Sequence, residues 1–455
     1  MEHEEIGQEK AMEYNHSADD CFEKREFEKA VEYYMKALAI AEREVGEKHP
    51  FVGAARNNIA LAYKNLSEYE KAFEWYDKAL SSVQKDKFHA ATTCNNIALV
   101  YKELGEHGKE LEWHLKAFKM LPKKHPYITD CCDNIAQTYL SLKELDKAIE
   151  WYQKELESGG KKKRQNFHTA KIHNRIAIIY YRQEEYKKAL KLLLPASKIF
   201  EEALGAEHPD TAHIYNDIAV TYAEKGDLNT ALEWCEKTIA IREKVLGGEH
   251  PDTTEVYIDT ARVYRRNKEY EKALEHYKKA LPAYERDRKG LDISEMYDDI
   301  ALMYNKLSDY GKSLEYLQKK LSVCEKTFGS EYPEMASLYD KIGRVYRNQG
   351  KHSEALEWFF KELEANEKTQ GKDHPNTASS CYEIAYTYVE QAEYRKAFEW
   401  CFKALRIYKA HDMEESAEAD KTLDELYNAY LNSGGRENDF VEWFAEELHK
   451  EENPK

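Results

Sequence analysis

The sequence predicts an all-α solenoid of about ten helix-turn-helix units followed by a C-terminal capping unit. Three observations lead to this prediction. One pattern of about 42 residues recurs along almost the whole chain, apolar residues inside each copy follow a helical period, and prolines stand at the starts of copies. Repetition therefore overrides the division into several globular domains that 455 residues would otherwise suggest.

Residues 205–247 contain the clearest copy of the pattern. Tyr215, Ile218, Ala219 and Tyr222 fall at i, i+3, i+4 and i+7, which predicts one apolar face of a first helix. Gly226 follows and can end that helix in a left-handed conformation. A second helix follows it. Its large apolar residues find no partner inside the unit, so we expect units to be stable only when they stack.

The copies can be aligned on a small residue in each first helix, at spacings of 38 to 42 residues. These residues are Ala18, Ala60, Ala98, Ala136, Ala177, Ala219, Ala261, Ala301, Gly343 and Ala385. A second small residue opens the second helix, and only Glu110 of the third unit interrupts that series. Small side chains at both places allow the two helices of a unit to approach closely.

Six of the ten prolines open a unit, where a missing N–H group costs little. Histidines precede five of them, at His49, His125, His208, His250 and His374. Because these histidines lie about 40 residues apart on successive units, they cannot converge on one metal ion. We therefore expect a structural role for them and predict neither a metal site nor a cofactor.

The predicted boundaries are residues 6–410 for the solenoid and 411–455 for a degenerate eleventh repeat. In that last segment Tyr430 and Gly434 keep the register, but Tyr427 replaces the small residue. We interpret it as a C-terminal cap, and a cap is expected to have a polar exposed face.

Composition narrows the functional classes. A formal net charge of −17 argues against nucleic acid as a partner, since Lys and Arg supply most of that affinity. Neither a membrane span nor a signal peptide is recognisable. The eight cysteines include no C-x-x-C pair and suggest free thiols in a reducing compartment, so we expect a cytoplasmic protein. The common catalytic motifs are absent, and we predict that the protein is not an enzyme.

The recurring small–x–x–Tyr of the first helix and the Ala of the second resemble the tetratricopeptide repeat. The longer period and the segment V-L-G-x-E-H-P-D-T are similar to the repeats of kinesin light chains. The resemblance covers nearly the whole chain. It implies a right-handed superhelix whose concave wall, built from the first helices, binds peptides or partner proteins.

Two adjacent positions before the small residue of each first helix are expected to face this groove, and in several units they carry amides. The candidates are Asn57, Asn58, Asn95, Asn96, Asn134, Asn174 and Asn216. An amide both donates and accepts, which suits contact with a peptide backbone. The resemblance implies this role. The alternative is hydrogen bonding between helices that supports the stack.

Basic side chains occupy the same face in other units, at Arg175, Arg262, Arg265, Lys341, Arg344 and Arg347. On an acidic chain they suggest a site for carboxylates of a partner. The alternative is that they pair with neighbouring aspartates such as Asp259, Asp299 and Asp340 and brace adjacent units.

The predicted function is a non-enzymatic scaffold that binds a peptide or partner protein, with an acidic segment as the favoured ligand. The alternative is a regulatory subunit whose groove holds part of an enzyme or a self-inhibiting segment. The repeat pattern specifies no oligomeric state.

Overall fold

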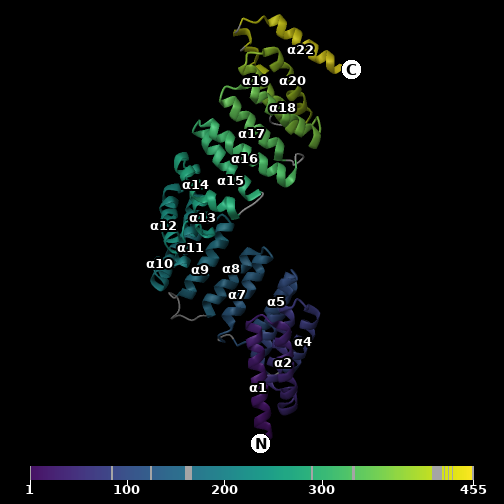
Figure 1. Cartoon of the computed structure of the whole chain (residues 1–455), viewed down its shortest axis with the longest axis vertical. Coiled ribbons are helices and arrows are strands. Elements are labelled where there is room, and N and C mark those ends of the chain that lie inside the picture. The colour runs from purple at the N-terminus through teal and green to yellow at the C-terminus, as the bar shows by residue number, and fades with distance from the viewer. Residues whose placement is uncertain are drawn as a thin grey trace. The chain divides into compact units, whose positions relative to one another are not determined.

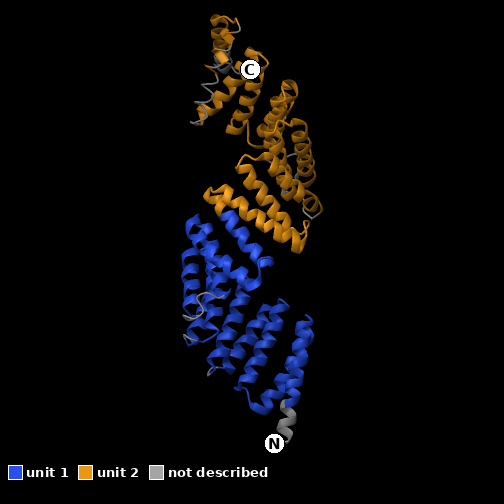
Figure 2. Cartoon of the chain, turned by 90° about the vertical axis from the view of Figure 1, so that its left-hand side faces the viewer, with its two compact units in different colours: residues 1–221 blue, residues 222–455 orange. Residues whose placement is uncertain are grey.

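The computed structural model describes residues 2–83, 86–122, 125–158, 167–287, 291–329, 334–411, 423–424, 426–428, 430–432 and 434–452. All regular secondary structure in these residues is helical. The chain divides into two compact units, unit 1 with residues 1–221 and unit 2 with residues 222–455 (Figure 2).

The helices up to α20 follow one another along the chain with short connections (Figure 1). They are α1 (Glu2–Glu23), α2 (Phe27–Val45), α3 (Pro50–Asn65), α4 (Tyr69–Ser82), α5 (Lys87–Glu103), α6 (His107–Met120), α7 (Ile128–Ser141), α8 (Leu145–Ser158), α9 (Phe167–Arg182), α10 (Tyr186–Leu204), α11 (Pro209–Lys225), α12 (Leu228–Leu246), α13 (Pro251–Arg266), α14 (Tyr270–Asp287), α15 (Leu291–Lys306), α16 (Tyr310–Phe328), α17 (Glu334–Asn348), α18 (His352–Thr369), α19 (Pro375–Glu390), α20 (Tyr394–Ala410) and α22 (Glu437–Glu452).

Apart from α11, where the two units meet in the sequence, each odd-numbered helix up to α19 pairs with the even-numbered helix after it, and the turn between them has three residues. Partners are therefore antiparallel, and successive pairs stack within each unit, which confirms the predicted all-α solenoid of helix-turn-helix repeats (Figure 1). Nine of the ten aligned small residues are alanines that are at most 1% exposed. The tenth is Gly343, where a Cβ atom would lie only 2.7 Å from the Phe359 ring, so this unit needs glycine.

The turn inside each repeat contains one residue in the left-handed region, always seven residues after the aligned small residue. Gly226 has φ +92°, which confirms the predicted helix end. In seven repeats a residue other than glycine takes this conformation: Arg25, Ser67, Lys143, Glu184, Lys268, Ser308 and Ala392, with φ near +60°. The sequence alone does not reveal these seven turns, because only glycine signals positive φ in advance.

The histidines before the opening prolines cap the first helices. The Nδ1 atom of His49 accepts the backbone N–H of Phe51 at 3.2 Å, and the same bond recurs at His125, His208, His250 and His374. In four of these helices proline is the first helical residue and histidine satisfies one of the free N–H groups that follow it, whereas α7 begins at Ile128, two residues after Pro126. The structural role expected for these histidines is therefore to accept a backbone N–H group at the start of the first helix.

Glu110 occupies the place that is a small residue in the other second helices, and it is 2% exposed. Its carboxylate accepts from the Thr138 hydroxyl at 2.9 Å and lies 2.8 Å from His107 Nδ1. One turn later, the buried His114 ring lies 2.8 Å from Asn95 Oδ1. Burial lowers the pKa of His114 to about 4, because the low-dielectric interior disfavours the imidazolium. The third repeat therefore has a polar core where its neighbours have an apolar one.

In the segment predicted to be an eleventh repeat, Gly434 has φ +94° and takes the left-handed conformation of the turn residues in the ten preceding repeats. Phe440 and Trp443 of α22 pack on Phe398 of α20, with ring centroids 5.0 and 6.2 Å apart. The beginning of the predicted C-terminal segment falls largely on residues 412–422, which lie outside the described residues. The expectation of a wholly polar exposed face is wrong for α22, since Val441 and Phe444 are exposed.

Candidate partner-binding site

Side chains of successive first helices contact one another at a fixed register. In unit 1, Asn96 Nδ2 donates to Asn57 Oδ1 at 3.0 Å, and Arg175 forms an ion pair with Asp133. In both cases one partner stands two positions before the aligned small residue of its own repeat. The other partner belongs to the preceding repeat and stands three positions before the aligned small residue there. These two positions therefore face each other across neighbouring helices.

Asn95 lies next to Asn96 but does not share its surroundings. It is 2% exposed and donates to the Tyr127 hydroxyl at 3.1 Å, while its carbonyl oxygen faces His114. Residues adjacent on a helix point about 100° apart, so only one member of each amide pair can follow the groove face. The contacts of Asn95 are those expected of a side chain that supports the stack.

The remaining candidate amides, Asn58, Asn134, Asn174 and Asn216, are half-buried. The side-chain oxygens of Asn174 and Asn216 are buried and have no hydrogen-bond partner among the described residues. Since these two amides occupy the same position in neighbouring repeats, they form the most polar part of this face in unit 1 beside Arg175.

Unit 2 repeats the register with charged side chains. Lys341 of α17 pairs with Asp298 of α15, which also lies 3.2 Å from the Lys320 ammonium of α16. Arg265 of α13 pairs with Asp299, and the Tyr277 hydroxyl donates to the same carboxylate at 2.7 Å. These cations connect neighbouring repeats, as the bracing interpretation expects.

Arg344 and Arg347 of α17 both contact Glu383 of α19. The Arg344 Nη2 and Arg347 Nη1 atoms each lie 2.6 Å from a Glu383 oxygen, and Arg344 Nε donates to Asp340 at 2.7 Å. Arg347 is only 12% exposed and its guanidinium lies over the Tyr386 ring at 4.8 Å. It is therefore mainly structural, whereas the Arg344 side chain is 47% exposed.

Arg262 stands apart from this cluster. Its side chain is 49% exposed, and its nearest carboxylate is Asp259 on the same helix at 3.6 Å. Exposed pairs of this kind contribute little to stability. Arg262 therefore keeps its charge available to solvent.

A pocket of about 310 Å³ opens among α13, α15, α16 and α17, all within unit 2. Three predicted residues line it together: Arg265, Lys341 and Arg344. Its apolar surface comes from Ala301, Leu302, Leu317 and Val345, and its remaining polar lining from Asp298, Asp299, Asn305 and Ser313. The volume is at the lower end of the range usual for ligand sites.

Two cations at the rim have hydrogen-bonding capacity left over. Within the described residues, Arg344 uses Nε and Nη2 but not Nη1, and the Lys341 ammonium contacts Asp298 alone. A guanidinium has five N–H groups and an ammonium has three. A carboxylate placed between Arg344 and Lys341 can therefore accept from both without displacing either existing ion pair.

Buried charge beside the pocket distinguishes these repeats from others. One position of the second helix lies seven residues after its small residue, or after Glu110, and we call it the inner position. In six repeats it is alanine and in a seventh it is threonine: Ala37, Ala79, Ala117, Ala196, Ala280, Ala404 and Thr238. It is Lys320 in α16 and Glu362 in α18, which are 9% and 5% exposed. Burial, followed by the nearby Asp340 carboxylate, raises the pKa of Glu362 to about 8. Glu362 is therefore mostly uncharged at neutral pH, and Lys320 is the buried charge. Burying charge is costly and is not required by the fold, since most repeats do without it.

Glu155 of α8 is the third charged residue at this inner position, and it lies in unit 1. It is 2% exposed, and burial raises its pKa to about 8. His168 Nε2 lies 3.1 Å from its carboxylate, close to the Arg175–Asp133 pair. At this position unit 1 therefore has one buried ionisable residue, and unit 2 has two in consecutive repeats.

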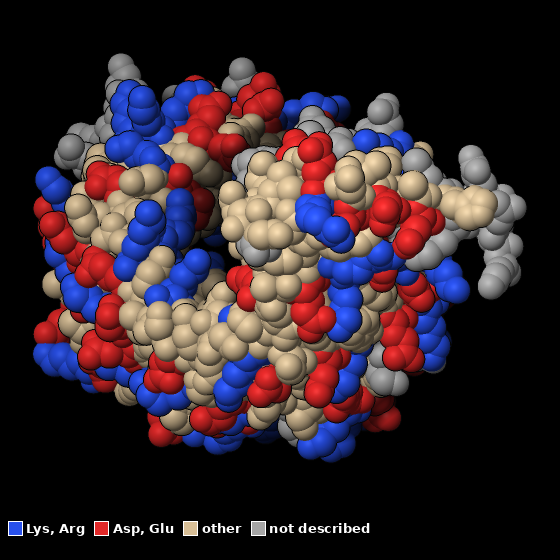
Figure 3. All heavy atoms as spheres, turned by 90° about the horizontal axis from the view of Figure 1, so that it is seen from above, with Lys and Arg blue, Asp and Glu red and all other residues tan. Residues whose placement is uncertain are grey.

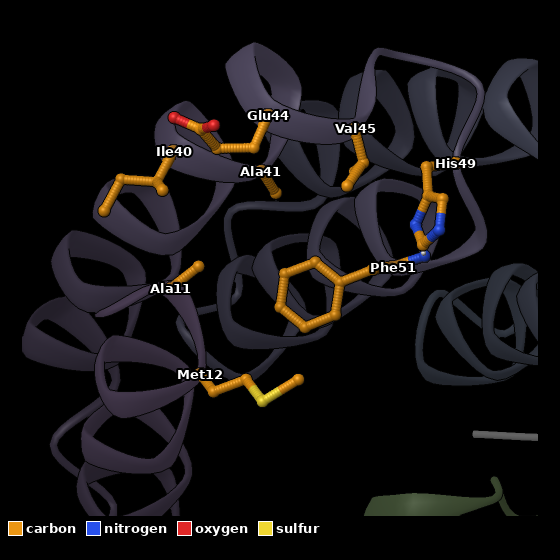
Figure 4. A pocket seen from close by; sticks show the side chains of 8 residues that line it. All are labelled: Ala11, Met12, Ile40, Ala41, Glu44, Val45, His49 and Phe51. Carbon is orange, nitrogen blue, oxygen red and sulfur yellow. Dashed lines mark hydrogen bonds between the residues drawn. The ribbon is translucent and has the colours of Figure 1, made fainter. Parts of the chain in front are cut away.

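A second cavity, of about 160 Å³, lies among α1, α2 and α3 of unit 1. Figure 4 shows the apolar side chains of Met12 and Phe51 turned toward this space, with Ile40 and Val45 on α2. It contains none of the predicted site residues, and its polar lining is limited to Glu44 and His49.

Two further properties of the described residues bear on function. No helix there combines the length and the apolar composition needed to cross a bilayer. Likewise, nowhere in the described ranges do three His, Cys, Asp or Glu side chains converge in the manner of a metal site.

Comparison with protein families gives one clear match. The tetratricopeptide repeat model matches residues 11–85, 53–123, 168–234, 215–286, 292–368 and 334–410, and a second tetratricopeptide repeat model matches residues 129–157. No curated protein matches the chain.

Several solved structures are similar to the chain at low sequence identity. The C-terminal part of a tetratricopeptide protein from Cytophaga hutchinsonii is 17% identical, with 63% of this chain and 98% of that one covered and a TM-score of 0.46. A kinesin-light-chain-like protein of Podosopora anserina with nearly identical repeats is 23% identical, with coverages of 45% and 98% and a TM-score of 0.41. YrrB, a repeat protein with an unusual peptide-binding site, is 21% identical, with coverages of 50% and 97% and a TM-score of 0.34.

Proposed function

Because the chain belongs to the tetratricopeptide repeat family, we propose that it is a non-enzymatic interaction scaffold that binds an acidic segment of a partner protein through unit 2. The binding site is the pocket lined by Arg265, Lys341 and Arg344. The observation that carries the proposal is the pair of cations with unused N–H groups at the rim of an apolar pocket.

A partner carboxylate lies between Lys341 and Arg344 and accepts charge-assisted hydrogen bonds from both. Such bonds are roughly twice as strong as neutral ones. An apolar side chain next to it in the partner enters the pocket over Leu302, which is 40% exposed. Affinity then comes from buried apolar area, and selectivity for acidic segments comes from the cations.

Charge distribution supports a protein partner rather than a nucleic acid. On the face seen in Figure 3, Lys and Arg are interspersed with Asp and Glu and do not form one large basic surface. The net charge of −17 opposes general binding to phosphates. A small group of cations inside an acidic protein instead favours short, local contact with carboxylates.

Partner capture with matched variants tests the proposal. The double variant Lys341→Gln/Arg344→Gln removes both charges and leaves the apolar pocket in place. The control Lys361→Gln/Lys237→Gln removes two charges at exposed second-helix lysines that stack on Trp358 and Trp234. A partner retained by the wild type and the control, but lost by the pocket variant, is the expected result. A partner that both variants retain would contradict the proposed site.

Photo-crosslinking locates the contact more directly. A benzoylphenylalanine at Leu302 is expected to crosslink to a peptide of the partner that contains Asp or Glu. The matched control places the same group at Leu61, which occupies the equivalent position of a unit 1 helix. Equal crosslinking from both positions, or a crosslinked peptide without acidic residues, would contradict selection of an acidic segment by unit 2.

A further inference from the structure

The outer face of α22 differs from the outer faces of the other second helices. In the ten preceding repeats, the second helix places its small residue, or Glu110, five residues after the left-handed turn residue. Gly434 is the turn residue of the eleventh repeat, so Asp439 occupies the corresponding place. This register allows every outer position of α22 to be compared with ten equivalents in the same chain.

Two residues after the position of Asp439 in this register, each of the ten preceding second helices has a charged residue. These residues are Glu32, Glu74, Glu112, Glu150, Lys191, Glu233, Glu275, Glu315, Glu357 and Glu399. Nine of them are exposed and Glu399 is half-buried. In α22 the equivalent residue is Val441, which is 60% exposed.

Four residues further on, nine of the ten second helices have a lysine, and the tenth has Pro195. These lysines are Lys36, Lys78, Lys116, Lys154, Lys237, Lys279, Lys319, Lys361 and Lys403. In α22 the equivalent residue is Ala445, which is exposed. The exposed Phe444 lies between the two substituted positions. Val441, Phe444 and Ala445 form an apolar strip at i, i+3 and i+4, which we call the α22 strip.

Packing among the described residues of unit 2 does not account for the α22 strip. The helix packs on its own repeat through other residues: Phe440 is 8% exposed, and the Trp443 ring lies 4.7 Å from that of Tyr430. Phe444 contacts Phe402 through one edge, at 5.4 Å, and is still 39% exposed. A solvent-facing position that is charged in ten repeats and valine in one indicates a surface that another molecule covers.

We propose that the α22 strip docks a basic amphipathic helix of a partner protein. The strip has the spacing by which two helices pack their apolar faces. Exposed carboxylates flank it at Glu437, Glu442 and Glu446, so Lys and Arg beside the apolar face of the partner meet opposite charge. A second copy of α22 would bring the same carboxylates together, which disfavours self-association through this face.

The test uses a substitution that copies the other repeats. Val441→Glu/Ala445→Lys restores the outer charge pair of the preceding second helices and leaves the net charge unchanged. The probe is a fluorescent synthetic helix of leucine and lysine, about 18 residues long so that it is helical when bound. Fluorescence anisotropy at physiological salt is expected to give binding about ten-fold weaker for the variant than for the wild type. The corresponding leucine–glutamate helix is expected to bind neither protein.

Three controls keep the interpretation specific. Circular dichroism and thermal unfolding show that the variant folds. Glu357→Val/Lys361→Ala creates a similar strip on α18 and measures how strongly any apolar strip binds the probe away from the acidic flanks of α22. Analytical ultracentrifugation compares the self-association of the wild type and the α22 variant.

Equal probe binding by the wild type and the α22 variant, or a preference for the leucine–glutamate helix, would overturn the proposal. So would a wild-type dimer that the variant abolishes, because the occupant would then be a second copy of the chain. Binding to neutral phosphatidylcholine vesicles that depends on Val441 would likewise replace the helical partner with a lipid surface.

Discussion

The groove-facing residue that follows each aligned small residue differs between the two units. In α3, α5, α7, α9 and α11 of unit 1 it is Leu61, Leu99, Gln137, Ile178 and Val220, and each is half-buried. In α13, α15, α17 and α19 it is Arg262, Leu302, Arg344 and Tyr386, and each is exposed. Both series occupy the same position of the repeat pattern, so the fold permits half-buried, mostly apolar residues as well as exposed, charged ones there. We therefore expect residue choice in the exposed series to affect the proposed binding more than it affects stability.

The largest expected effect comes from removing the half-buried Arg347 of unit 2. Arg347→Ala leaves Glu383 partly unpaired at 7% side-chain exposure and removes contacts with Tyr386 and Phe359. Breaking a buried ion pair typically costs about 3–5 kcal/mol. We expect a loss of this size in urea denaturation, with faster hydrogen exchange in α17 to α19 and unchanged exchange in α1 to α9. Arg262→Ala is the control and should cost at most about 1 kcal/mol.

Acid is expected to destabilise unit 1 through its buried histidine. The pKa of His114 is about 4 in the folded protein and near 6.5 when unfolded, so the unfolded state gains the proton first as pH falls. Stability should therefore decrease by about 3 kcal/mol between pH 6.5 and pH 4. Hydrogen exchange of α5 to α7 measures this loss. His114→Gln should reduce the pH dependence of the free energy of unfolding between pH 6.5 and pH 4. An unchanged pH dependence would show that other groups cause the loss of stability.

Gly343→Ala tests close packing in the repeat that contains the pocket. The new methyl group would lie 2.7 to 3.0 Å from the Phe359 ring, and overpacking of this kind costs about 1–3 kcal/mol. The double variant Gly343→Ala/Phe359→Leu should recover part of the loss, because leucine is smaller at the point of contact. Equal destabilisation of the single and double variants would mean that the contact is not the cause.

The smallest expected effects concern the turns, which should not differ between units. Ser67→Gly in unit 1 and Lys268→Gly in unit 2 relieve a left-handed conformation at φ near +60°. After allowance for the greater flexibility of unfolded glycine, each should stabilise the protein by about 0.5–1 kcal/mol. Thermal unfolding measures both. A gain in one unit only would show that the turns are not equivalent.

The regular part of the fold was predictable because small residues and prolines recur at fixed spacing. Ala219 and Gly226 have the predicted places, since both follow from local helix geometry. The individual roles of Asn95 and Asn96 were not predictable, because adjacent helical residues point in directions that depend on the exact phase of the helix.

Ion pairs between repeats were only partly predictable. Lys341 and Asp298 lie 43 residues apart, and their pairing depends on the offset between neighbouring helices. A search for opposite charges one repeat apart could have found this pair and the Arg175–Asp133 pair, which lie 42 residues apart and occupy the same two positions of the repeat. The unused N–H groups of Arg344 required atomic coordinates.

Peptide selection tests the central claim most directly, namely that unit 2 and not unit 1 selects acidic segments. A random peptide library is selected on the wild type, on Lys341→Gln/Arg344→Gln and on the unit 1 variant Asn57→Ala/Asn96→Ala, and the bound peptides are sequenced. We expect Asp and Glu to be enriched beside an apolar residue on the wild type and the unit 1 variant, and this enrichment to disappear on the unit 2 variant. Enrichment that persists on the unit 2 variant, or that disappears on the unit 1 variant alone, would contradict the proposed site.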